Sequence, residues 1–252
     1  MHRLFLPPEE LTSDEVIITG DNARHLSLVL RIQAGEPIEI LDGNGYKYTC
    51  TVKSVYKKEV VATIINKESY SVESPVAVTL CQGIARGGKM DLLIQKSIEL
   101  GVNAIIPVIT ERSQVRNTKK LERWRKIATS ASQQSGRDKI PEISDPVTLK
   151  DWIPDQACLS GRQVRNDKKE TLKLIFSETY KEQTLKNLLK AEKSIKQIFL
   201  LIGPEGGFSK EEITEAVENG YVEVSLGPRI LRTETAPITV MSIIQYELGD
   251  MS

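Results

Sequence analysis

The segment "QIFLLIGPEGGFSKEEITEAVENG", residues 197–220, contains the pattern that decides the fold. Its mostly apolar first part predicts a buried strand, and Ser209 with Glu212 forms a capping box that predicts the start of a helix. The turn between them, Gly203 to Gly207, is rich in glycine. A strand, a turn and a helix in this order are typical of a parallel α/β sheet, in which ligands bind beyond the carboxyl ends of the strands.

The same alternation of strand and helix extends over residues 73–252. Strands are predicted at residues 76–83, 103–110, 172–178 and 221–227, and helices at residues 89–101, 119–136 and 235–248. Alternation of this kind predicts a mainly parallel sheet that is covered by helices. Residues 73–252 are therefore expected to form one α/β domain.

Residues 1–72 follow a different pattern. Short strands are predicted at residues 15–20, 36–41, 46–56 and 60–67, separated by turn signals such as the Asp-Gly-Asn-Gly of residues 42–45. These strands predict a small β-barrel that ends near residues 68–75. One helix is predicted at residues 23–31, with Leu26, Val29 and Leu30 on a common face.

The charges balance over the whole chain but not along it. Thirty-four basic residues match thirty-four acidic ones, so any nucleic acid must be bound by a local patch. Residues 111–140 contain nine basic and three acidic residues, whereas residues 1–72 contain eight basic and ten acidic ones. The basic run therefore predicts phosphate contacts, which position RNA without reading its sequence.

Cysteine and histidine give no sign of a disulfide framework or a metal site. Cys50, Cys81 and Cys158 are odd in number and lack C-x-x-C spacing, and we expect them to be buried. His2 and His25 lack the spacing of metal ligands. Apolar runs stay far short of the roughly 20 residues that span a membrane, and the chain shows no signal peptide. A cytoplasmic protein without a metal is expected.

Two neighbouring loops carry the candidate chemistry. The loop of residues 203–208 lacks both the P-loop lysine and the G-x-G-x-x-G order, so a nucleotide phosphate is not its predicted ligand. The loop "LGPRILRTETA", residues 226–236, exposes backbone groups beside Ile230 and Leu231, which suits a flat heterocycle such as adenine. Arg232 adds a fixed cation. The alternative is a surface ion pair of Arg232 with Glu234 and a helix N-cap at Thr235.

Several blocks of the sequence resemble one known family. "LLIGPEGGFSKEEI", "LGPRILRTETAPIT", "RGGKMDLLIQKSIELGV", "ERSQV" and "QQSGRDKIPEI" are similar to signature blocks of the uridine N3-methyltransferases of small-subunit ribosomal RNA, a branch of the SPOUT superfamily. "MHRLFL" and "HLSLVLR" resemble the PUA-like RNA-binding barrel of that family. The resemblance covers nearly the whole chain. It implies a C-terminal trefoil knot that binds S-adenosylmethionine, and a homodimer.

The resemblance also assigns residues, with two departures from the family pattern. Ser177 and Glu178 stand where relatives often carry His-Pro, and Gln133 stands where they commonly carry Glu. The expected cofactor-binding residues are Phe176, Ser177, Gly203, Pro204, Glu205, Gly206, Gly207, Leu226, Gly227, Ile230, Leu231, Thr233, Thr235 and Ala236. The expected RNA-binding residues are Arg3, Arg24, Arg31, Arg86, Arg112, Arg116, Lys119, Lys120, Arg123 and Arg137.

The expected catalytic residues are Arg232 and Glu234. Methylation at N3 requires loss of the N3 proton, and the guanidinium of Arg232 would stabilise the uracil anion. Glu234 would orient Arg232 or accept the proton. Glu205 would bind ribose or cap the following helix.

Other functions compete with this hypothesis. A related knotted methyltransferase could act on transfer RNA or on a ribose 2′-hydroxyl, and a non-catalytic ribosome assembly factor could keep the fold and bind RNA. Intact glycines at residues 203–207 and the presence of Arg232 argue against the second alternative. The expected substrate is the ribosomal RNA or the assembled 30S particle.

Overall fold

The computed structural model describes residues 2–116, 118–153, 170–178, 182–191 and 194–251. It separates the chain into two compact units. The first unit comprises Met1–Glu73 and Ser132–Ile140, and the second comprises Ser74–Ala131 and Pro141–Ser252. Each unit has its own hydrophobic core.

The first unit is built on one five-stranded sheet. Its strands are β1 (His2–Phe5), β2 (Glu15–Thr19), β3 (Pro37–Leu41), β4 (Tyr46–Val55) and β5 (Glu59–Ser69), in the order β1-β3-β4-β5-β2. All neighbours are antiparallel except β1 and β3. The four strands predicted from alternation are confirmed, because Val16, Ile18, Ile38 and Ile40 alternate into the core.

The prediction of one α-helix at residues 23–31 is wrong, because most of this segment is π-helical. Helix α1 (Gly20–Arg24) continues into a π-helical turn, η2 (His25–Val29), in which the amide of Leu30 donates to the carbonyl oxygen of His25 at 2.9 Å. The wider turn rotates successive side chains differently from an α-helix. Leu26 is buried as expected, but Val29 is 67 % exposed.

The segment Ser132–Ile140 packs into the first unit through polar contacts. The hydroxyl of Tyr70 donates to the carbonyl oxygen of Gly136 at 3.2 Å, and the amide of Val72 donates to the carboxylate of Asp138 at 2.9 Å. The guanidinium of Arg137 pairs with the carboxylate of Glu73, and both side chains are buried. Residues that are distant in sequence therefore complete the N-terminal unit.

The second unit is built on a parallel sheet. The strands are β6 (Ala77–Gly83), β7 (Ala104–Ile109), β8 (Glu142–Ile143), β9 (Val147–Thr148), β10 (Thr171–Phe176), β11 (Gln197–Ile202) and β12 (Val222–Val224). Their order is β12-β10-β11-β6-β7-β8, with β9 also beside β7, and each pairing is parallel. The predicted mainly parallel sheet is confirmed.

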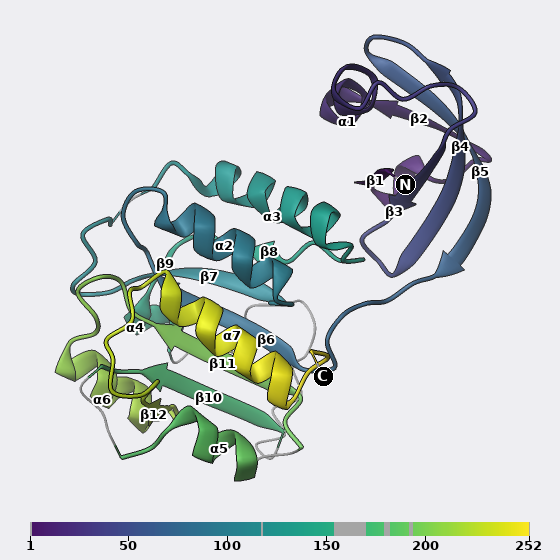
Figure 1. Ribbon diagram of the computed structural model, residues 1–252. Coiled ribbons are helices and arrows are strands. Elements are labelled where there is room, and N and C mark those ends of the chain that lie inside the picture. Colours follow the sequence, from purple (N-terminus) through teal and green to yellow (C-terminus); the bar gives the residue numbers. More distant parts are fainter. Residues whose placement is uncertain (1, 117, 154–169, 179–181, 192–193, 252) are drawn as a thin grey trace. The chain divides into compact units, whose positions relative to one another are not determined.

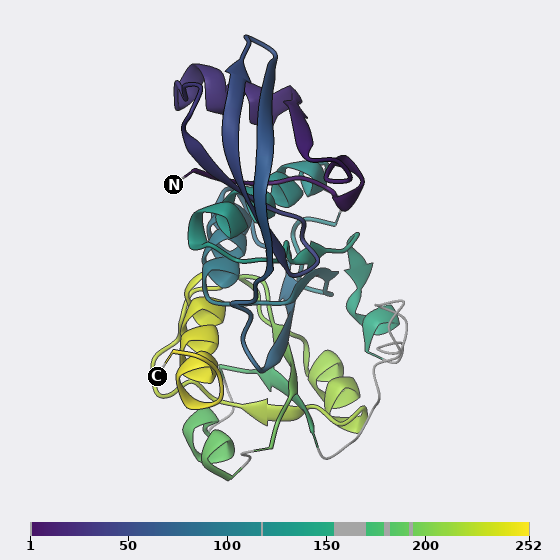
Figure 2. The same ribbon diagram turned by 90° about the vertical axis from the view of Figure 1, so that its right-hand side faces the viewer.

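Helices cover both faces of this sheet (Figures 1 and 2). One face packs against α2 (Lys89–Glu99), α3 (Leu121–Ser135), α5 (Leu185–Ala191) and α7 (Thr235–Glu247), and the other packs against α4 (Leu149–Trp152) and α6 (Lys210–Glu218). Ser209 and Glu212 form the predicted capping box at the start of α6. The sequence did not predict β8, β9, α4 or α5, since elements this short carry too few residues for a period to show.

The described residues contain no helix that is both long and apolar enough to cross a bilayer. Cys50 and Cys81 are fully buried, as expected. Burial raises the pKa of the Cys50 thiol to about 11. Cys158 lies outside the described residues.

Candidate functional site

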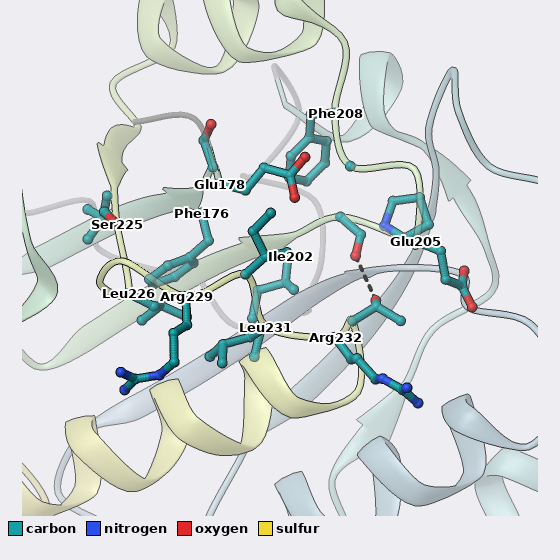
Figure 3. A pocket seen from close by; sticks show the side chains of 18 of the residues that line it. Phe176, Glu178, Ile202, Glu205, Phe208, Ser225, Leu226, Arg229, Leu231 and Arg232 are labelled. Carbon is teal, nitrogen blue, oxygen red and sulfur yellow. Dashed lines mark hydrogen bonds between the residues drawn. The ribbon is translucent and has the colours of Figure 1, made fainter. Parts of the chain in front are cut away.

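The loops that follow β10, β11 and β12 surround one cavity of about 490 Å³ in the second unit (Figure 3). This placement follows from the parallel sheet, because the carboxyl ends of neighbouring strands meet at one edge. The predicted residues that line the cavity are Phe176, Ser177, Gly203, Pro204, Glu205, Gly207, Leu226, Gly227, Ile230, Leu231, Arg232, Thr233 and Ala236. Gly206, Glu234 and Thr235 are outside its lining.

The cavity has an apolar wall and a charged rim. Phe176, Ile202, Leu226 and Leu231 gather on one side of it (Figure 3). Charged residues from several elements line it too: Lys89, Arg112, Glu178, Glu205, Lys210, Arg229 and Arg232. An apolar wall with a few polar groups is the usual composition of a small-molecule site.

Two glycines in the cavity wall adopt backbone conformations that other residues rarely adopt. Gly207 has φ +65° and Gly227 has φ +111°. A Cβ atom added at either position would meet no neighbouring atom within 4 Å, so both glycines border open space. A side chain here would be strained and would also extend over the backbone that a ligand could approach.

Thr233 ties the loop after β12 to the loop after β11. Its hydroxyl donates to the carbonyl oxygen of Gly203 at 2.8 Å and accepts from the side-chain amide of Gln82, on β6, at 3.2 Å. Thr233 and Gln82 are both buried. Gln82 was not among the predicted site residues. An amide inside an apolar strand is nevertheless a recognisable signal, because a buried amide requires a partner.

Glu205 is bound by residues at and just before the start of α2. Its carboxylate accepts from the backbone amide of Arg86 at 3.1 Å and from the ammonium of Lys89 at 2.8 Å. Burial alone would raise the pKa of Glu205, but the hydrogen bond from Lys89 and further contacts hold that pKa below its ordinary value. Glu205 does not cap the following helix, whose N-cap is Ser209.

Arg232 and Glu234 do not interact with each other. Arg232 is exposed, and within the described part of the chain its side chain makes no ion pair. The side chain of Glu234 is 15 % exposed, and its Oε2 atom lies 3.8 Å from Nζ of Lys89. The expected surface ion pair is therefore wrong, as is the orienting role of Glu234 in this geometry. Thr235 is the first residue of α7 and not its N-cap.

The basic run carries several intramolecular contacts. Arg112 donates to the carbonyl oxygen of Gly206 at 3.2 Å, and Lys120 donates to that of Gly87 at 3.0 Å. Arg116 donates to the carbonyl oxygen of Glu111, and Arg123 pairs with Asp91 at 2.7 Å. All four side chains remain exposed, as do Lys119 and Arg86. Arg112 also lines the cavity, which its place in the charge pattern did not reveal.

The arginines of the first unit differ in their availability. Arg24 and Arg31 are exposed, whereas Arg3 pairs with Glu39 at 2.7 Å and lies over the ring of Tyr70. The expectation that Arg137 contacts RNA is corrected, because this residue is 5 % exposed and pairs with Glu73. The charge count included Arg137, but a count does not report burial.

Other lining residues were not predicted as part of the cavity: Lys89, Arg112, Glu178, Ile202, Phe208, Lys210, Ile213, Val224, Ser225, Pro228 and Arg229. Glu178, Ile202, Val224, Ser225 and Pro228 lie at or beside strand ends, so the rule that placed the loops could have found them. Lys89, Lys210 and Ile213 come from helices, and only the tertiary fold brings them to the site.

Two family models match the chain. An RNA methyltransferase domain matches residues 72–245, and an RNA methyltransferase PUA domain matches residues 18–65. The ribosomal RNA small subunit methyltransferase E of Buchnera aphidicola subsp. Schizaphis graminum is 34 % identical over 96 % of this chain and 95 % of its own length. The protein of that name from Bacillus subtilis is 31 % identical, over 98 % of this chain and 97 % of its own.

Solved structures are similar over the full length. A ribosomal RNA small subunit methyltransferase E from Neisseria gonorrhoeae, bound to S-adenosyl methionine, has a TM-score of 0.87 and 36 % identity, and the match covers 100 % of both chains. A protein from Legionella pneumophila in complex with the same cofactor has a TM-score of 0.86 and 34 % identity, and the match covers 99 % of this chain and 98 % of that one. The chain therefore belongs to the RNA methyltransferase family that includes the ribosomal RNA small subunit methyltransferases E.

Proposed function

We propose that this chain transfers a methyl group from S-adenosylmethionine to N3 of a uridine in small-subunit ribosomal RNA. One observation carries the proposal: a cavity formed by two glycine-bearing loops has the exposed Arg232 at its rim, without an ion-pair partner among the described residues. The names of the relatives and the cofactor in the Neisseria structure support the same activity.

The residues of the cavity fit the cofactor. A volume of about 490 Å³ lies within the range of roughly 300 to 1,000 Å³ that is usual for ligand sites. Ile202, Leu226 and Leu231 offer an apolar wall for adenine, and the open space beside Gly207 and Gly227 allows a ligand to approach the backbone. When bound, S-adenosylmethionine supplies an electrophilic methyl group on a sulfonium.

Arg232 would act on the base. N3 of uridine becomes a good nucleophile only after it loses its proton, and the resulting negative charge requires stabilisation. A guanidinium without an intramolecular ion pair can provide this stabilisation with little reorganisation. For the proton, Glu234 is the candidate acceptor because it stands two residues from Arg232 and its Oε2 atom accepts no hydrogen bond among the described residues. Its carboxylate would have to turn from Lys89 toward the cavity to come within hydrogen-bond reach of the base.

The proposal includes a trefoil knot in the second unit. After β12 at one edge of the sheet, Thr233 returns to the ends of β11 and β6 in its middle. Such a return is compatible with the threading that the family resemblance implies. A homodimer and action on small-subunit ribosomal RNA or the 30S particle belong to the same proposal and come from that resemblance. A cytoplasmic location also belongs to it and comes from the short apolar runs of the sequence.

The test is nucleoside mass spectrometry of RNA methylated by the purified protein. Ribosomal RNA, naked or in 30S particles, from cells that lack this protein should acquire one N3-methyluridine. Methylation of transfer RNA instead, or of a ribose hydroxyl, would replace the proposal with a related methyltransferase. Cofactor binding without methylation of any of these RNAs would favour the non-catalytic assembly factor.

A further inference from the structure

We propose that Lys89 is a positioning residue that holds the two loops of the cavity in place by binding Glu205 and Glu234. The inference rests on the proposed function and names a further residue for it. Lys89 is the first residue of α2, far in sequence from both carboxylates. Glu205 belongs to the loop after β11 and Glu234 to the loop after β12.

The geometry places one ammonium group between two carboxylates. Nζ of Lys89 lies 2.8 Å from Glu205 and 3.8 Å from Glu234. The exposed fractions of the three side chains are 35 % for Lys89, 27 % for Glu205 and 15 % for Glu234. An ion pair this shielded is screened less by solvent and salt than a fully exposed pair.

Glu234 depends on this ammonium group. Its Oε2 atom is buried and accepts no hydrogen bond, and Lys89 is the cation within 4 Å of it among the residues that the structure describes. Removal of Lys89 would leave a shielded carboxylate without a compensating charge, which destabilises its surroundings. Glu205 would keep its hydrogen bond from the amide of Arg86.

The position of Arg232 also depends on Lys89, although no contact between the two side chains is seen among the described residues. Because the side chain of Arg232 makes no ion pair with any residue that the structure describes, the backbone of its loop determines where the guanidinium lies. That backbone is held by the residues that follow: the carbonyl oxygen of Arg232 accepts from the amides of Thr235 and Ala236, Thr233 binds Gly203, and Glu234 pairs with Lys89. Lys89 would therefore affect both the cofactor loop and the position of Arg232.

Lys89 also lines the cavity, so direct contact with the cofactor is the competing explanation. A double-mutant cycle separates the two, because effects of residues that act through each other are not additive. Lys89→Met and Glu205→Gln should each weaken cofactor binding about tenfold, and the double variant should be within about twofold of the weaker single one. A double variant weakened about 100-fold would overturn the proposal, as would unchanged affinity in Glu205→Gln.

The control and the conservative variant use the same helix. Lys96 pairs with Glu99 one turn apart on α2, and Lys96→Met should bind the cofactor like the unmodified protein. Lys89→Arg keeps the cation and should restore affinity to within about threefold. Thermal melting of each variant shows whether it is folded. If Lys89→Met does not fold, Glu205→Gln and Lys89→Arg still decide the outcome.

A second readout addresses Glu234. At saturating cofactor, the single-turnover methylation rate of Lys89→Met should fall at least about fivefold, with Lys89→Arg recovering most of it. An unchanged rate would overturn the connection to Glu234 and Arg232. Calorimetry with S-adenosylmethionine needs no RNA, so the affinity cycle reports on Lys89 even if the RNA substrate proves to be another one.

Discussion

The loop after β11, residues 203–208, and the loop after β12, residues 225–234, line the same cavity but differ in how their middle residues are held. In the first loop, Gly203 accepts from Thr233, Glu205 accepts from Lys89, and Gly206 accepts from Arg112. In the second loop, Ile230 is 76 % exposed and Arg232 makes no ion pair among the described residues.

Among the residues that the structure describes, the hydrogen bonds of the second loop lie near its two ends. Ser225 accepts from the amide of Gly227 at 3.2 Å, and Thr233 binds Gly203. Between these anchors lie two exposed arginines, Arg229 and Arg232. We therefore expect the first loop to be organised before ligands arrive and the second loop to present groups that ligands bind.

The largest expected effect breaks the second loop at Arg232. Arg232→Ala should lower the methylation rate about 100-fold while cofactor affinity stays nearly unchanged, because a preorganised charge matters most where negative charge develops. Arg232→Lys should recover little, since a point charge does not reproduce the planar fork. Single-turnover kinetics and calorimetry measure the two quantities. Equal loss of rate and affinity would mean that Arg232 binds the cofactor. An equally large loss of rate in Arg229→Ala would contradict a specific role of Arg232.

The next effect extends the comparison to the basic run. Changing Arg116, Lys119, Lys120 and Arg123 together to Ala should weaken RNA binding and flatten its salt dependence, by roughly 0.7 to 0.9 in log-log slope for each phosphate that is no longer bound. Arg24 and Arg31, the exposed arginines of the first unit, provide the comparison variant. RNA affinity is measured at several salt concentrations. If the Arg24→Ala, Arg31→Ala variant has a flatter salt dependence than the fourfold variant, the main RNA-binding surface lies on the first unit.

Glycine substitutions test both loops at the backbone. Gly207→Val and Gly227→Val should each weaken S-adenosylmethionine binding at least about tenfold, or about 1.4 kcal/mol. Gly220→Val is the matched control, because Gly220 also has a positive φ of +83° and open space around it but does not line the cavity. The control should lose stability and keep its affinity. Similar affinities of all three variants in calorimetry would mean that the loops are only turns.

Loss of the link between the loops should have a smaller effect. Thr233→Val removes the hydrogen bonds to Gly203 and Gln82 and should lower the free energy of unfolding by about 1 to 2 kcal/mol. Thr239→Val is the control, since the hydroxyl of Thr239 donates only within its own helix, to Thr235. Denaturant unfolding measures both variants. An equally small decrease in the free energy of unfolding in both variants would show that Thr233 does not link the loops.

The smallest expected effect is on acid stability. The pKa of Glu205 lies below its ordinary value of 4.5 in the folded protein, so the ionised form of this carboxyl is favoured by folding. The stabilisation is complete above the unfolded-state pKa and disappears as the pH falls through the folded-state pKa. Unfolding of Glu205→Gln should therefore depend less on pH below about 4.5 than unfolding of the unmodified chain. Identical acid profiles would contradict the ion pair with Lys89.

The sequence predicted the parallel sheet and both loops because their signals are local. The capping box at Ser209 and the apolar run before Gly203 need no tertiary information. The partners of Lys89 and Gln82 could not be assigned in this way, since they are more than 100 residues away in the chain. Arg137 shows the converse, because a charge count cannot distinguish an exposed arginine from one paired inside a unit.

The most direct test of the central claim is the amount of N3-methyluridine in small-subunit ribosomal RNA, measured by mass spectrometry. Deletion of this protein should remove one N3-methyluridine, and the unmodified chain should restore it. A chain with Arg232→Ala, expressed at the same level, should leave that uridine largely unmethylated. Unchanged N3-methyluridine after deletion would contradict the proposed activity. Full restoration by Arg232→Ala would contradict the role assigned to the loop after β12.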